Sequence, residues 1–225
     1  VPLPFEYTSE NVEMLAKGCA NLQKHIQNAR SYGVPVVVAI NKFSSDTDAE
    51  HEVIRKASIE AGATDAIVSN HWEEGGEGAK NLAEGIIKCS NKEYPGQLQD
   101  EKFHYLYDLE GSIENRIEKI AKEMYGAGSV KFSDVAKEKI AEYTAQGFNN
   151  LPICIAKTQY SFSHDQNLKG VPTGFEFPIK DIKASIGAGY LYALADNIMT
   201  IPGLATKCGF MNVEVNDKGE IEGLF

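Results

Sequence analysis

Residues 34–40 read Val-Pro-Val-Val-Val-Ala-Ile, a short apolar run rich in β-branched side chains. Such a run is typical of a strand that is covered on both faces, as in a parallel sheet. A polar loop over 41–48 follows its carboxyl end, and a second strand is expected over 65–69. Helical patterns precede, separate and follow these strands. This alternation predicts right-handed βαβ crossovers, and therefore an α/β fold with a parallel sheet.

The rest of the chain extends this pattern. Helices are expected at 8–32, at 79–88, at 112–125 and at 133–146, with Ser133 as an N-cap. Another helix is expected between the 41–48 loop and about Ala61. Further strands are expected at 103–107 and 151–156. Beyond residue 157 the texture changes, with alternating stretches at 181–186 and 210–215 and a turn at 216–219 before 220–222. We therefore expect a parallel-sheet βαβ domain with ligand-facing loops at 1–156, followed by a smaller β-containing lobe at 157–225.

Composition excludes several classes of protein. The formal net charge of -10 and the isoelectric point near 5.0 argue against a nucleic-acid partner, which needs clustered Lys and Arg. No apolar run approaches the roughly 20 residues that span a bilayer, so we expect no membrane partner. The four cysteines are far apart and are expected to be reduced core thiols. They favour an intracellular, cytoplasmic compartment, with a mitochondrial one left open.

Other chemistries lack a pattern. The five histidines show no metal-ligand spacing, and we expect no metal site and no catalytic nucleophile. Asn41-Lys42 after an apolar strand resembles the guanine-reading motif of GTPases. The aspartate of that motif would fall at Ser44, and no G-x-x-x-x-G-K-[ST] loop is present in the sequence. A GTPase is therefore not expected.

A Gly-rich loop follows the second strand and contains Gly75, Gly76 and Gly78 just before the helix expected at 79–88. Backbone N–H groups at a helix start can face an anion or a polar ring. The same glycines also suit a tight turn that needs positive φ. The sequence leaves both interpretations open, and Glu74, Gly75 and Gly76 are candidate ligand-loop residues.

Two aromatic residues lie in the loops at this expected sheet edge. Trp72 is the only tryptophan of the chain, and Phe43 lies in the neighbouring loop after Asn41, a further candidate. Aromatic residues in polar loops are poor candidates for core, and two such rings can clamp a flat heterocycle by stacking. Lys157 and Thr158 follow another apolar strand, where a binding role and an ordinary polar strand exit are both possible.

Several long stretches resemble formate-tetrahydrofolate ligase, also called 10-formyltetrahydrofolate synthetase. The resemblance covers essentially the whole chain, and it rests on residues 150–163, 170–175, 182–189, 199–204 and 223–225.

The resemblance implies an ATP-driven ligase of one-carbon metabolism and purine biosynthesis. Formate is phosphorylated to formyl phosphate, and the formyl group passes to N10 of tetrahydrofolate. The whole enzyme would use Mg-bound ATP and tetrahydrofolate, with no cofactor held tightly by this chain. Members carry a Walker-type phosphate loop near the synthetase N-terminus, which this sequence lacks. We therefore expect the C-terminal portion of a synthetase, as in eukaryotic C1-tetrahydrofolate synthase, inactive without its N-terminal partner portion and homo-oligomeric in the full enzyme.

In the resembled family, an aromatic residue and a tryptophan at the positions of Phe43 and Trp72 flank a flat ring of folate or adenine. Ser44 stands where many relatives have a proline, so we expect a looser loop around Phe43. Two other hypotheses stay open at this point. One is a catalytically silent folding or dimerisation module, and the other is a stand-alone flavodoxin-like nucleotide binder.

Overall fold

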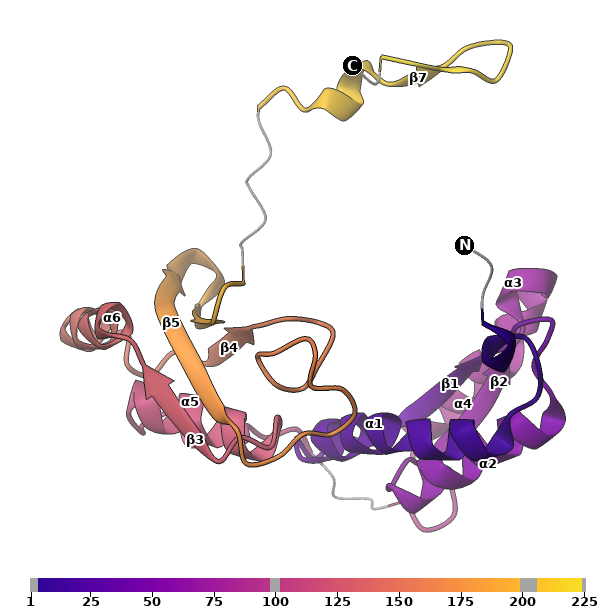
Figure 1. Cartoon of the computed structure of the whole chain (residues 1–225), viewed down its shortest axis with the longest axis horizontal. Helices are drawn as coiled ribbons and strands as arrows, with labels where there is room; N and C mark the ends of the chain where they lie inside the picture. Colours follow the sequence, from indigo (N-terminus) through magenta and orange to yellow (C-terminus); the bar gives the residue numbers. More distant parts are fainter. Residues whose placement is uncertain (1–3, 98–101, 199–205, 224–225) are drawn as a thin grey trace.

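A computed structural model describes residues 4–97, 102–198 and 206–223 (Figure 1). The described chain is an α/β protein with a parallel two-stranded sheet, a four-stranded sheet and a short C-terminal hairpin. The expected fold class is therefore confirmed. Two of the stretches that carry the family resemblance, 199–204 and most of 223–225, lie outside the described residues.

The first sheet contains the stretch that begins the sequence argument. Strand β1 (Val37–Asn41) pairs in parallel with β2 (Asp65–Ser69), in a register that joins Asn41 to Ser69 at the carboxyl end. The helices of this unit are α1 (Val12–Arg30), α2 (Asp48–Glu60), α3 (His71–Glu74) and α4 (Lys80–Ser90). Helices α2 and α4 pack on β2, and α1 packs on α2. The βαβ unit expected from the sequence is confirmed.

The helices begin where short polar side chains accept backbone N–H groups. Asn11 accepts from Met14 at the start of α1, and Thr47 forms a capping box with Glu50 at the start of α2. Ser112 and Ser133 cap α5 (Ile113–Glu123) and α6 (Asp134–Ala145), so the expected role of Ser133 is confirmed. These bonds satisfy N–H groups that have no partner within the helix.

The second sheet is mixed. Its strands are β3 (Ser129–Phe132), β4 (Ile153–Ala156), β5 (Glu176–Ser185) and β6 (Tyr190–Ala195), in the order β3-β5-β6-β4. The β3–β5 and β4–β6 pairs are parallel, whereas β5 and β6 are antiparallel. Strands from both sides of residue 157 thus share one sheet. The division into 1–156 and 157–225 stays a prediction, and that boundary runs through this sheet.

The main core lies between this sheet and helices α5 and α6, where Phe177, Ile182 and Leu191 have no exposed surface. Arg116 of α5 is also buried, with 1% of its surface exposed. Its guanidinium donates to the carbonyls of Leu151, at 2.6 Å, and Asn149. A buried charge needs such partners, and these bonds fix the segment that leads into β4.

Contacts between the two units involve α1. Asn28 Nδ2 donates to Met124 O at 2.9 Å and Lys24 Nζ to Glu123 O at 2.7 Å, both at the end of α5. Asn21 Nδ2 donates to Gly170 O at 3.1 Å. Helix α1 therefore packs on α2 on one side and bonds the second unit through polar side chains.

The remaining short elements are the 3-10 turns Phe5–Tyr7, Glu77–Ala79, Ile186–Ala188 and Gly209–Asn212, and the hairpin strands β7 (Glu214–Val215) and β8 (Ile221–Glu222). The hairpin turns at 216–219, as the sequence predicts, and Asn216 Oδ1 accepts from the N–H groups of Lys218 and Glu220.

The strand expected at 103–107 is wrong. The segment pairs with no strand in the described part of the chain, and its aromatic rings pack on one another and on Tyr32 instead. Phe103 lies 6.0 Å from Tyr32 and 5.4 Å from Tyr105 between ring centroids, and Tyr105 lies 6.0 Å from Tyr107. Alternating aromatic residues gave a strand-like pattern whose physical cause is ring packing. Cys154 also departs from expectation, since it is exposed on β4.

Candidate functional site

Phe43 and Trp72 lie in the loops that leave the carboxyl ends of two adjacent parallel strands. The register places Asn41 beside Ser69, so the loop after β1 and the loop after β2 begin side by side. Lys42 N donates to Ser69 O at 3.0 Å and extends this pairing. Phe43 is 66% exposed and Trp72 is 87% exposed. Ligands bind at this edge in open α/β sheets, and both rings are accessible there.

The loop that carries Phe43 is a tight turn closed by two hydrogen bonds between Phe43 and Asp46. Phe43 N donates to Asp46 Oδ2 at 2.8 Å, and Asp46 N donates to Phe43 O at 3.1 Å. The same carboxylate oxygen lies 3.8 Å from Nε2 of the buried His51. These bonds close the loop without a proline at position 44. The looser loop expected from Ser44 is therefore offset by Asp46.

Glu50 ties this loop to a second helix. One carboxylate oxygen accepts from Thr47 N at 3.1 Å within the capping box, and the other accepts from Asn11 N at 2.9 Å at the start of α1. The N–H groups of Asn11 and then of Thr47 lower the pKa of the Glu50 carboxyl. The sequence signal for the cap is Thr-x-x-Glu at 47–50, but the bond to Asn11 required α1 to lie beside α2.

The loop after β2 contains one short helix and closes on itself. Asn70 N donates to Gly78 O at 3.0 Å, and Asn70 Nδ2 donates to Glu73 and to Glu74, the latter at 2.9 Å. Ser69 Oγ and His71 Nδ1 lie 3.0 Å apart. Trp72 therefore projects from a loop whose polar neighbours are internally bonded.

At two of the three glycines of this loop, the backbone conformation or a close backbone contact requires glycine. Gly75 ends α3 with φ of 61° and ψ of -137°, a conformation that side chains disfavour. A Cβ at Gly78 would meet the carbonyl oxygen of Asn70 at 2.3 Å. Gly76 has φ of -61° and open space around it. The tight-turn interpretation thus accounts for Gly75 and Gly78. The helix start expected right after these glycines lies at Lys80, after a 3-10 turn.

The two rings do not touch each other. No ring contact joins Phe43 to Trp72 among the described residues. Neither residue lines any of the larger hollows of the described chain. The structure brings both aromatic residues, together with Asn41 and Glu74, to one sheet edge. Whether they flank a ligand stays a prediction.

Lys157 lies at the end of β4, in the other sheet. Its ammonium donates to the carbonyls of Thr158, at 2.9 Å, and Ser161, and it lies 5.0 Å from the ring centroid of Tyr125. Burial lowers the pKa of Lys157. Its donors are thus used within its own loop and on a neighbouring ring. This geometry favours a role in shaping the strand exit over direct contact with a ligand.

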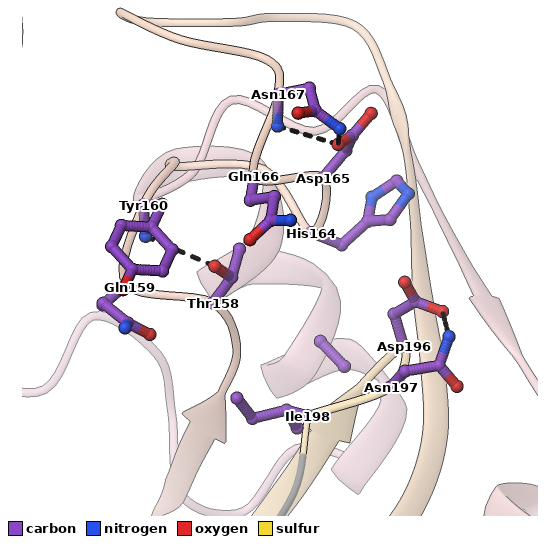
Figure 2. A pocket seen from close by; sticks show the side chains of 11 residues that line it. Thr158, Gln159, Tyr160, His164, Asp165, Gln166, Asn167, Asp196, Asn197 and Ile198 are labelled. Carbon is purple, nitrogen blue, oxygen red and sulfur yellow. Dashed lines mark hydrogen bonds between the residues drawn. The ribbon is translucent and has the colours of Figure 1, made fainter.

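Thr158 lines a polar hollow between the loop after β4 and the loop after β6 (Figure 2). Its Oγ1 accepts from Tyr160 N at 3.3 Å. Figure 1 shows β4 and its loop well apart from α3, which carries Trp72. The structure therefore does not place Lys157 and Thr158 at the Phe43–Trp72 edge, and the candidate residues fall into two groups.

Comparison with known proteins identifies the family. The family model described as "Formate--tetrahydrofolate ligase" matches residues 4–225. The chain belongs to the formate--tetrahydrofolate ligase family. It is 57% identical to the cytoplasmic C-1-tetrahydrofolate synthase of Saccharomyces cerevisiae, covering 100% of this chain and 23% of that protein. It is 56% identical to the mitochondrial form of that yeast, covering 99% and 22%.

A relative that bears the family's name is the formate--tetrahydrofolate ligase of Arabidopsis thaliana, at 47% identity over 99% of this chain and 34% of that protein. This member of the formate--tetrahydrofolate ligase family thus spans between about a fifth and a third of the relatives it matches. Within 4–97, 102–198 and 206–223, no helix has the length and apolar character needed to cross a membrane.

Proposed function

We propose that this chain supplies the aromatic ligand-binding edge of a ligase that formylates tetrahydrofolate at N10, with formate and Mg-bound ATP as co-substrates. Family membership supports the reaction class. One structural observation carries the assignment of the site. Phe43 and Trp72 are solvent-exposed aromatic residues on loops that start at paired residues of adjacent parallel strands. A folate or adenine ring between them would gain stacking from both sides.

The loops are preorganised for this role. Asp46 and Glu50 fasten the Phe43 loop, and Asn70 with Gly78 closes the Trp72 loop. Loops that are ordered before binding lose less conformational entropy when the ligand arrives. The site therefore contributes binding and orientation, and the phosphoryl-transfer step is assigned to groups outside this chain.

The proposal includes partners and compartment. The chain would work with an N-terminal synthetase portion and within a homo-oligomer. The two Saccharomyces cerevisiae relatives are named as cytoplasmic and mitochondrial forms, and we propose the cytoplasm for this chain. As a separate 225-residue polypeptide it should bind its ring ligand without forming 10-formyltetrahydrofolate from ATP, formate and tetrahydrofolate.

A fluorescence titration tests the binding edge. Trp72 is the only tryptophan, so a ring stacked on it should quench nearly all indole emission. Phe43→Ala keeps this reporter and should weaken the apparent affinity for a folate about two- to twelve-fold, because one stacking contact contributes roughly 0.5–1.5 kcal/mol.

The matched control is Phe210→Ala, since Phe210 is 65% exposed and lies in the 3-10 turn at 209–212. It should leave the titration unchanged. A folded chain that shows no quenching by folate or ATP at millimolar concentration, after inner-filter correction, would support the silent folding or dimerisation module instead.

A further inference from the structure

A second ligand-accessible edge lies in the mixed sheet. Strands β4 and β6 are parallel neighbours, with Ala156 beside Leu194, so the loops over 157–160 and 196–198 leave the same edge. A hollow of about 700 Å³ lies between them, and the segment 164–167 completes its wall (Figure 2). Carboxyl ends of adjacent parallel strands are the usual place for a ligand in such sheets, and this volume suits a small molecule.

The backbone at this edge departs from regular strand geometry. Asp196 has φ of 49°, in the left-handed region, and its N–H donates to Pro178 O at 3.2 Å. Strand β5 has an irregular register between Ile179 and Asp181, and Lys180 Nζ at this point reaches Asn197 Oδ1 at 3.5 Å. Left-handed non-glycine residues and bulges recur beside functional sites, where they aim side chains.

The lining is polar. Among the described residues it contains the carboxylates of Asp165 and Asp196, several side-chain amides and no Lys or Arg. Two lysines reach it from outside, since Lys180 Nζ bonds Asn197 Oδ1 and Lys169 Nζ lies 5.7 Å from the centroid of the Tyr160 ring. Figure 2 shows Thr158, Tyr160 and Gln166 on one side, and Asp196 with Asn197 on the other. The two carboxylates disfavour phosphates and other anions at their own side of the hollow. Carboxylates accept hydrogen bonds, whereas amides both donate and accept, which suits a ligand with several hydroxyl groups.

His164 adds a buried polar atom beside this hollow. Its Nδ1 is buried and has no hydrogen-bond partner in the described part of the chain. The ring lies against Phe175 and Phe177, at 6.1 and 6.3 Å between centroids. A buried ring nitrogen without a partner costs free energy, so water or a polar ligand group near it would be favoured.

We propose that this hollow binds an uncharged, hydroxyl-rich ring of the pentose type, as a free sugar or as the sugar of a nucleoside. Asp196 accepts from adjacent hydroxyl groups and Gln166 bonds the remaining ones. Asn197 holds the carboxylate of Asp196, because its Nδ2 donates to Asp196 Oδ1 at 3.2 Å while Lys180 Nζ bonds its Oδ1. Tyr160 is 60% exposed and lines the hollow beside Lys169. The site belongs to a different sheet from Phe43 and Trp72. It therefore stands or fails independently of ring stacking there.

Ligand-observed saturation-transfer NMR on the full chain tests the site with D-ribose, adenosine and adenine, all free of phosphate. Asp196→Asn removes the charge and keeps both the shape and a residue type that tolerates positive φ. Gln166→Ala is a second variant, and it disturbs no hydrogen bond given for the described residues. Asp217→Asn, in the turn at 216–219, makes the same charge change far along the chain and is the matched control.

The expected result is saturation of the sugar protons of D-ribose and adenosine at millimolar ligand. Asp196→Asn should weaken this binding roughly tenfold, the effect of one lost charged hydrogen bond, and Gln166→Ala should weaken it less. Asp217→Asn should have no effect. Equal binding of both ligands indicates a free-sugar site, and tighter adenosine binding that still needs Asp196 indicates a nucleoside site.

Two results would overturn the proposal. One is the absence of D-ribose saturation, with adenosine either not bound or bound equally well by Asp196→Asn, because the sugar would then not be the recognised group; adenine binding alone decides nothing, since the Phe43–Trp72 edge can account for it. The other is unchanged sugar binding in both Asp196→Asn and Gln166→Ala. Quenching of Trp72 by folate, measured on the same samples, should be unaffected by either variant, which separates failure of this site from failure of the aromatic edge.

Discussion

Glu50 is the residue whose removal should reveal how the Phe43 loop is held. Its two carboxylate oxygens cap α2 through Thr47 and bond Asn11 at the start of α1. In Glu50→Ala both helix starts lose an acceptor. Because one N-terminal capping interaction contributes about 0.5–2 kcal/mol, the free energy of unfolding should fall by about 1–3 kcal/mol. For a chain of this size that corresponds to a melting temperature lowered by roughly 2–10 °C.

The assay is thermal and urea unfolding followed by circular dichroism. Glu52→Ala is the control, because it removes the same charge from the exposed face of the same helix. The pH dependence gives a second reading. The pKa of Glu50 is lowered from its ordinary value of 4.5 in the folded chain. Its contribution is therefore present above that value and is lost as the pH falls through the folded pKa.

The difference in stability between the native chain and Glu50→Ala should thus be largest near neutral pH and shrink in acid. Two outcomes would refute the reasoning. Equal loss in Glu52→Ala would mean that net charge and not capping is responsible. A difference that persists unchanged in strong acid would mean that the carboxylate form is not what stabilises the helix starts.

Three further substitutions have defined outcomes. Gly78→Ala should destabilise the chain and weaken ligand quenching of Trp72, because its Cβ would meet Asn70 O at 2.3 Å, whereas Gly76→Ala should be neutral or slightly stabilising in the same melts. Arg116→Met strands the carbonyls it bonds before β4, and urea unfolding should show a loss of about 1–3 kcal/mol for each buried unpaired acceptor. Burial raises the pKa of Tyr125 to about 12. The free energy of unfolding should therefore fall as the pH rises from 10 towards 12, and it should fall less in Tyr125→Phe than in the native chain.

Each of these has a contrary result. Equal melting of the two glycine variants would remove the close-approach argument. Full stability of Arg116→Met would mean that solvent reaches those carbonyls. An identical alkaline profile in Tyr125→Phe would assign the loss of stability to other groups.

Local patterns in the sequence were sufficient for most of the first unit. The β-branched run before Asn41, the spacing of apolar residues in α1 and the glycine after it are all features of near neighbours in the chain. They fix element type because burial and backbone preference act over a few residues. The hairpin at 214–222 was predictable for the same reason, since Asn216 and Gly219 specify the turn.

In the second sheet, the sequence predicted β4 and part of β5, but β3 and β6 could not be read in this way. Strand β3 has four residues, and β6 follows β5 after a 3-10 turn at 186–188, so neither gives a distinct periodic signal. Their pairing is decided by contacts with residues distant in sequence. Segment 103–107 shows the opposite error, because its strand-like alternation consists of aromatic residues whose rings pack on one another outside any strand. Non-local pairing overrides local preference in each case.

The candidate site follows the same division. Exposure of Phe43 and Trp72 on polar loops was predictable from their neighbours. Glu50 can bond Asn11 only because α1 lies beside α2. Lys157 donates to nearby carbonyls because its loop folds back on itself. These are tertiary facts without a local pattern.

The central claim is that Phe43 and Trp72 clamp one ring, and a double-mutant cycle tests it most directly. Calorimetric titration of a folate into the native chain, Phe43→Ala, Trp72→Ala and the double variant needs no tryptophan reporter. Rings that sandwich one ligand depend on each other, so the two losses should couple by at least about 0.5 kcal/mol. Purely additive losses, or no loss in either single variant, would contradict the clamp.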